Sequence, residues 1–92
     1  MLKKFDEDLR SYVFTTRFVI EKGSEITFVS HNEDGDWQFM SDDSFTEEDA
    51  RIVSLEEMIE HDSSILELAD MLVGYEAVRE NKFSRWNSIK SE

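Results

Sequence analysis

The sequence predicts an α+β domain: an antiparallel sheet of about four to five strands with short helices packed on one face. Alternating apolar residues flank a turn-forming stretch at Asn32–Gly35, as expected of a β-hairpin. Two helix-capping patterns occur between residues 54 and 68, where the apolar spacing becomes helical. The chain has 92 residues, of which 39% are hydrophobic, which suits one small core. We therefore expect a single domain over residues 1–92.

The N-terminal segment is expected to pack on the sheet as a helix. Leu2, Phe5 and Leu9 recur at helical spacing, so residues 1–11 are expected to form a short amphipathic helix. Residues 11–21 are rich in β-branched and aromatic side chains, which favour a strand. An unalternated apolar run at residues 18–20 fits either a strand buried on both faces or a bend in the middle of the stretch.

A β-hairpin is expected at the centre of the chain. A turn after residue 21 leads into a strand over residues 25–31, and Asn, Asp and Gly then supply a tight reversal. If His31 faces Asp36 across the hairpin, Phe28 faces Phe39. That register places the two phenylalanines on one side of the sheet, with His31 and Asp36 on the other.

The second half of the chain alternates between helical and strand patterns. Ser54 and Ser64 are each followed three residues later by Glu, the pattern of a capping box. We expect a loop or single helical turn over 41–49, a short strand at 51–53, and then two short helices or one bent helix after the two caps. A last strand follows over 75–80. Beyond it we expect Phe83 and Trp86 to be buried and residues 87–92 to form a frayed tail.

The chain is strongly acidic, with a formal net charge of −12. This balance argues against nucleic acid or an anionic membrane as a partner. Between Asp42 and Asp70 eleven acids face one base, Arg51. The pattern fits either a solvated acidic surface or a docking face for a basic protein partner. The candidate docking residues are Asp42, Asp43, Glu47, Glu48, Glu56 and Glu60.

Composition also bears on location. The chain has no cysteine, which suits a reducing compartment. The first residues carry acids where a signal peptide would need an apolar run. No segment approaches the roughly 20 apolar residues that span a bilayer. We therefore expect a cytoplasmic protein.

The acidic hairpin loop invites a metal interpretation, which its spacing does not support. Asn32, Asp34 and Asp36 alternate like calcium ligands. An EF-hand loop, however, needs Gly at its sixth position and Glu at its twelfth, and counting from Asn32 gives Trp37 and Asp43. We predict neither a metal nor a cofactor. We also predict no catalytic residue, because no phosphate loop or nucleophile motif is present.

Several residues of the hairpin and the C-terminal segment are candidates for a structural or interaction role. We expect Gly35 to take a positive φ and His31 to hydrogen-bond a carboxylate, with Asp36 the nearest. Arg79 is expected to pair with a loop carboxylate such as Asp34 or Asp36. The two tryptophans are core residues or, alternatively, interface anchors. The full set is His31, Asp34, Gly35, Asp36, Trp37, Arg79 and Trp86.

The segment His31–Phe39 resembles a known signature, H-x-E-D-G-D-W-Q-F, of a family of small bacterial proteins of unknown function. Part of that family is grouped with the immunity proteins of polymorphic-toxin systems. The resemblance continues through residues 51–55, 60–62 and 74–79, and ends at Trp86. The chain departs from the family pattern near Gly74, where it lacks a preceding proline and has tyrosine in place of a following tryptophan.

The resemblance implies an immunity protein, or a relative of one, that neutralises a toxin by occlusion. The composition and the lack of a catalytic motif favour a non-enzymatic protein, and the acidic charge favours a basic toxin domain as its partner. A small acidic adaptor or regulator of another protein is the alternative. A metal-binding or enzymatic protein that uses the loop from His31 to Asp36 is the third interpretation. The oligomeric state and the choice between the hairpin loop and the acidic helical face remain open at this stage.

Overall fold

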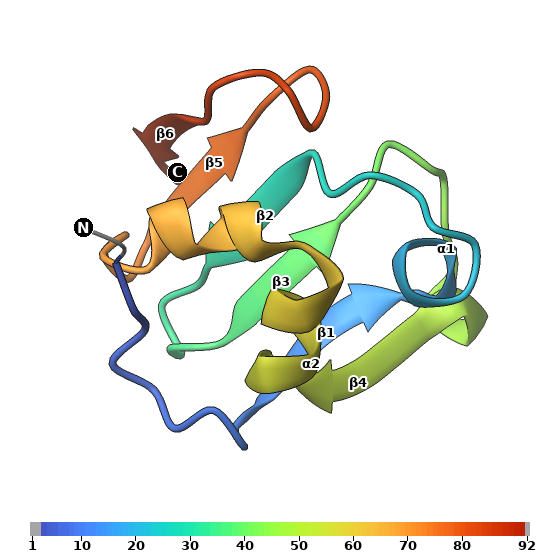
Figure 1. Cartoon of the computed structure of the whole chain (residues 1–92), viewed down its shortest axis with the longest axis horizontal. Coiled ribbons are helices and arrows are strands. Elements are labelled where there is room, and N and C mark those ends of the chain that lie inside the picture. Colours follow the sequence, from blue (N-terminus) through green and yellow to red (C-terminus); the bar gives the residue numbers. More distant parts are fainter. Residues whose placement is uncertain (1–2, 92) are drawn as a thin grey trace.

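The computed structural model describes residues 3–91 and confirms a small α+β fold, built on one six-stranded sheet (Figure 1). Across the sheet the strands lie in the order β4-β1-β3-β2-β5-β6. All neighbouring pairs are antiparallel except β1 and β3, which are parallel, so the sheet is mixed. The strands are β1 (Tyr12–Thr16), β2 (Phe28–His31), β3 (Trp37–Met40), β4 (Ala50–Ser54), β5 (Tyr75–Val78) and β6 (Asn87–Lys90).

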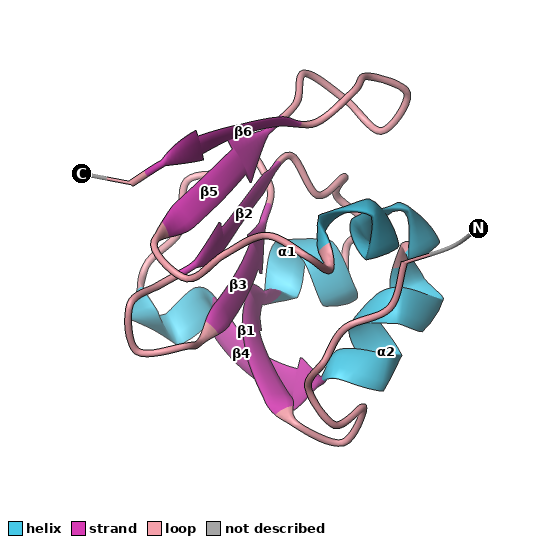
Figure 2. Cartoon of the chain, turned by 90° about the vertical axis from the view of Figure 1, so that its left-hand side faces the viewer, coloured by secondary structure: helices cyan, strands magenta, loops and turns pink. Residues whose placement is uncertain are grey.

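Short helices cover one face of this sheet. Figure 2 shows α2 (Leu55–His61) and the turns that follow it on one side of the strands. Those turns form the 3₁₀ helix η2 (Ser63–Leu68), so the predicted break between two helices near residue 62 is confirmed. A single helical turn, η1 (Glu47–Asp49), lies in the expected loop, and α1 (Arg17–Ile20) follows β1. The core lies between sheet and helices, where Val13, Val29, Phe39, Leu55, Met58 and Ile65 are all at most 2% exposed.

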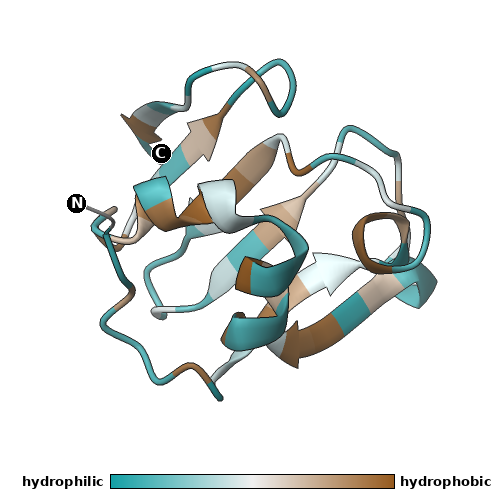
Figure 3. Cartoon of the chain, viewed as in Figure 1, coloured by the Kyte–Doolittle hydropathy of each residue, from teal (hydrophilic) through white to brown (hydrophobic). Residues whose placement is uncertain are grey.

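Polar residues dominate the connections between these elements. Figure 3 shows hydrophilic residues in most loops and hydrophobic ones concentrated on the strands and helices. Among residues 3–91, no helix has the length and apolar character that crossing a membrane requires.

The predicted N-terminal helix is wrong over the residues that the structure describes, and Leu2 lies outside them. Residues 3–11 form no helix. They form bends and a turn, with Phe5 buried and Glu7 half-buried. The carbonyls of Leu9 and Ser11 accept hydrogen bonds from the first amides of α2, at 2.9 and 2.8 Å. These tertiary contacts outweigh the helical spacing of the sequence because they satisfy the amides that α2 leaves unpaired.

The predicted strand over residues 11–21 is shorter than expected: β1 is followed by the single helical turn α1. This turn is the bend that the apolar run allowed.

The predictions for the C-terminal segment were wrong in two places. Residues 87–90 form β6, which pairs with β5, so this part of the expected tail is ordered rather than frayed. Phe83 is 87% exposed rather than buried, whereas Trp86 is half-buried against the core.

The hairpin is confirmed, with its register shifted by one residue from the prediction. His31 pairs with Trp37, and Val29 pairs with Phe39. These four side chains therefore share the covered face of the sheet, and Phe28 lies on the opposite face. The observed register places His31 inside the molecule, on the same face as Trp37. The predicted register had placed the two residues on opposite faces.

Loop geometry explains the shift. Asn32 and Asp36 close the loop, and the Asn32 amide donates to the Asp36 carbonyl at 3.0 Å. The Asn32 side-chain oxygen accepts from the amides of Asp34 and Asp36, both at 3.0 Å. Gly35 has a φ of +89°, as predicted, and ends a three-residue loop (33–35) of the turn-plus-left-handed kind.

Candidate functional site

Trp37 lies at the centre of a group of side chains that we call the hairpin cluster: Phe5, Glu7, His31, Trp37 and Phe39. The His31 ring stacks on the indole with 3.9 Å between centroids, and Phe5 meets it edge-on at 5.0 Å. The indole Nε1 donates to Glu7 Oε2 at 2.8 Å. Trp37 is 2% exposed, so the core interpretation of this residue is confirmed. The cluster attaches the extended N-terminal segment to the sheet.

Both ring nitrogens of His31 face protein groups. Nδ1 lies 2.9 Å from the carbonyl of Met71, and because a carbonyl only accepts, Nδ1 carries the proton of this bond. Nε2 lies 3.7 Å from Glu7 Oε2. The predicted partner Asp36 was wrong, because the true register turns His31 inward while Asp36 stays exposed at the loop. The carboxylate near His31 is Glu7, from the N-terminal segment.

A second group, the Arg79 cluster, joins the sheet to η2. It contains Asp62, Ser64, Arg79 and Trp86. The Arg79 side chain is 1% exposed and donates from Nη2 to Asp62 Oδ2, from Nη1 to Ser64 Oγ and from Nε to the Ile26 carbonyl, each at 2.9 Å. The guanidinium carbon also lies 4.1 Å from the centre of the Trp86 ring.

Asp62 is held in turn by η2. Its Oδ1 accepts from the amide of Ser64 at 3.0 Å and from the Ser64 hydroxyl at 2.6 Å, which caps the helix. An ion pair for Arg79 was predicted correctly, but the predicted partners, Asp34 and Asp36, were wrong. Those two acids lie in the hairpin loop beyond the opposite end of the neighbouring strand β2, exposed to solvent.

The six candidate docking acids form two groups rather than one. Asp42, Asp43, Glu47 and Glu48 precede β4, whereas Glu56 and Glu60 lie on α2, which starts where β4 ends. Five strand residues separate the groups, about 17 Å. All six are exposed. The acidic surface predicted from composition is therefore divided between the two ends of the sheet, with Asp42 beside Thr27 at the end of the central strands.

Several loop acids are fixed by hydrogen bonds. The hydroxyls of Ser24 and Ser41 stabilise the Asp43 carboxylate and hold its pKa below the ordinary value of 3.8. Arg17 Nε lies 2.6 Å from Asp49 Oδ1, and this bond lowers the pKa of Asp49 in the same way. These carboxylates are thus ionised at neutral pH and maintain the negative charge of the β3–β4 loop.

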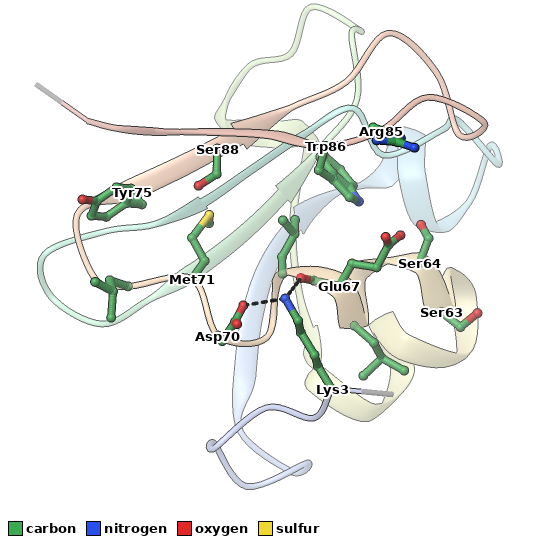
Figure 4. A pocket seen from close by; sticks show the side chains of 13 residues that line it. Lys3, Ser63, Ser64, Glu67, Asp70, Met71, Tyr75, Arg85, Trp86 and Ser88 are labelled. Carbon is green, nitrogen blue, oxygen red and sulfur yellow. Dashed lines mark hydrogen bonds and ion pairs between the residues drawn. The ribbon is translucent and has the colours of Figure 1, made fainter. Parts of the chain in front are cut away.

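A groove of about 1170 Å³ lies between η2 and the C-terminal strands (Figure 4). Lys3 borders it and bonds to Asp70 Oδ1 at 3.1 Å. Met71, Tyr75 and Trp86 give it apolar walls. Figure 4 shows the indole nitrogen of Trp86 turned toward the helical side of the groove, and this buried nitrogen has no hydrogen-bond partner among residues 3–91. It remains a donor for a water molecule or a ligand oxygen.

Sequence reasoning missed Glu7, Asp62, Ser64 and Met71 as partners of the candidate residues. Glu7 had been assigned to a helix, and no local pattern places it beside a hairpin thirty residues away. The capping role of Asp62 could have been found from the sequence, because Asp62 lies in the predicted break between two helices and a short carboxylate side chain caps a helix well. Among the residues that the structure describes, no group of three or more His, Cys, Asp or Glu is placed to hold a metal ion.

Comparison with known proteins identifies no relative: no family model, curated protein or solved structure matches the chain.

Proposed function

We propose that this chain is a non-enzymatic protein-binding domain, an immunity protein or a relative of one, that neutralises a basic bacterial toxin domain by occlusion. The observation that carries the proposal is that the side chains shared with the family signature stabilise the fold. His31, Trp37 and Arg79 are buried and hydrogen-bonded to other parts of the chain. Because their polar atoms bond to other parts of the chain, a partner must be bound by surface residues.

That surface is acidic. The net charge is −12, and acids such as Glu47, Glu48, Glu56 and Glu60 point into solvent. A basic partner would be attracted over a distance of about 10 Å at moderate salt and would associate quickly. A nuclease is a suitable toxin, since its cleft is built to attract phosphate. A cytoplasmic location fits this role and the cysteine-free composition.

The direct test uses the purified product of the gene beside this chain's gene, with any toxic activity inactivated by mutation. We expect a stable complex whose association rate falls about tenfold or more between low and high salt. Charge reversal by Glu47→Lys with Glu48→Lys should slow association and flatten the salt dependence. Reversal of Glu67 and Glu80, which are exposed and lie outside the β3–β4 loop, makes the same change in net charge and serves as the matched control. Absence of any complex would refute the proposal.

A further inference from the structure

The face of the sheet opposite the helices has an unusual composition. By the strand pairing, Tyr12, Phe14 and Ile52 point away from the covered core, because their neighbour Val13 is buried on the helical side. The register carries the same face across the remaining strands. We call this surface the open sheet face and define it by seven large apolar residues: Tyr12, Phe14, Phe28, Met40, Ile52, Val78 and Ile89.

These side chains are accessible. Tyr12 is 76% exposed, Ile52 60% and Ile89 55%, while Phe28 and Met40 are half-buried. A solvated sheet face ordinarily alternates apolar-in with polar-out. Here large apolar residues extend from the edge strand β4 to the edge strand β6. Gln38, Ser30 and Glu76 also lie on this face, in the row between Phe14 and Ile89, so the apolar residues form a band beside a short polar row. An exposed apolar band of this kind on a small domain indicates a contact site.

The charges around the face indicate the kind of partner. Among the strand residues that the structure describes, Glu76 is the only charged one on this face; Arg51 and Lys90 have the opposite parity. The flanking loops add acids at both ends, with Asp34 and Asp36 in the hairpin loop and Asp42, Glu47 and Glu48 in the β3–β4 loop. Exposed apolar residues flanked by acidic loops complement a partner that has an apolar patch flanked by bases.

The size of the face argues against a second copy of the chain. Six strands about 4.8 Å apart and three residue rows along them give a footprint of about 24 Å by 13 Å, or roughly 300 Å². A stable interface needs about 800 Å² per partner, so contact must continue onto the loops. In a dimer of identical chains the acidic loops of both copies would meet and repel.

We propose that the open sheet face, with the acidic loops at its two ends, is the surface that binds a folded basic protein domain. This inference rests on the proposed function and assigns it to a surface distinct from the outer face of α2. Tyr12 and Ile52 supply apolar anchors at the β4–β1 edge, and the loop acids steer and orient the partner.

The test is calorimetric titration with the same purified product of the neighbouring gene. We expect Tyr12→Ser with Ile52→Ser to weaken binding by about 30-fold or more. The loss should be similar at low and high salt, because apolar contacts are not screened. Leu72→Ser with Phe83→Ser is the matched control: these residues are 68% and 87% exposed and lie off the face, so affinity should change less than about threefold.

Hydrogen exchange of the wild-type complex gives a readout that does not depend on how the variants fold, with new protection expected in β1 and β4. If the wild-type chain binds while the face variant binds equally well and β1 and β4 gain no protection, the open sheet face is not the site and the proposed function stands. If the wild-type chain does not bind, the proposed function fails and this inference fails with it. A wild-type dimer that Tyr12→Ser with Ile52→Ser dissociates would assign the face to a second copy and overturn the proposal.

Discussion

The two faces of the sheet differ in a way that separates folding from binding. On the covered face polar side chains are buried, and His31 and Arg79 are 8% and 6% exposed with partners for their nitrogens. On the open sheet face large apolar side chains such as Tyr12 and Ile52 are exposed. Buried polar groups are costly to leave unpaired, whereas exposed apolar groups contribute little to the native state. Substitutions on the two faces should therefore affect different properties.

The largest effect is expected at the Arg79 cluster. Arg79→Met leaves Asp62 without its cation and removes three hydrogen bonds, two to Asp62 and Ser64 at η2 and one to the carbonyl of Ile26. We expect the free energy of unfolding to fall by about 3–5 kcal/mol, measured by urea denaturation. Arg85→Met is the control, because Arg85 is exposed, and it should cost less than about 0.5 kcal/mol. Equal losses in the two variants would mean that the cluster is not structural.

A smaller effect is expected at the hairpin loop. Gly35 has a φ of +89°, and a Cβ added there would contact nothing within 4 Å. The cost of Gly35→Val is therefore backbone strain alone, about 1–3 kcal/mol in thermal or urea unfolding. Glu33→Val, in the same loop at a position without positive φ, should change stability by less than half of that. A Gly35→Val protein as stable as its parent would contradict the loop geometry.

The acid dependence of stability should respond to Asp49. Its pKa is lowered in the folded protein by Arg17, so its contribution to stability is present at neutral pH and is lost as pH falls below about 4. Asp49→Asn should be less stable than wild type at pH 7, and its stability should decline less on acidification. Urea unfolding at several pH values between 2 and 7 measures this. Glu48→Gln, an exposed neighbour, should retain the wild-type profile.

Local features of this fold could be predicted from the sequence because they depend on local chemistry. Gly35 takes its positive φ because the loop requires it. Ser54 caps α2 by accepting from the Glu57 amide at 3.1 Å, as the capping pattern predicts. The break at Asp62 likewise follows from residues a few positions apart. Each of these is set by a short stretch of chain.

Apart from the hairpin register, the features that could not be predicted depend on residues distant in sequence. The hairpin register rested on whether the loop closed at His31 or Asn32, and the Asn32 side chain decided it by binding two amides. Glu7 and Asp62 became the partners of His31 and Arg79 because tertiary packing placed them there. The parallel pairing of β1 and β3 has no local signal either.

The smallest effect on stability is expected on the open sheet face. It tests the central claim most directly, which is that the core covers one face of the sheet and the other face is exposed to solvent. Tyr12 and Val13 are neighbours on β1, 76% and 2% exposed. We predict that Val13→Ala lowers the free energy of unfolding by about 2 kcal/mol, while Tyr12→Ala changes it by less than about 0.5 kcal/mol. Equal losses in urea denaturation would show that the open face is covered in the isolated protein and would contradict the account.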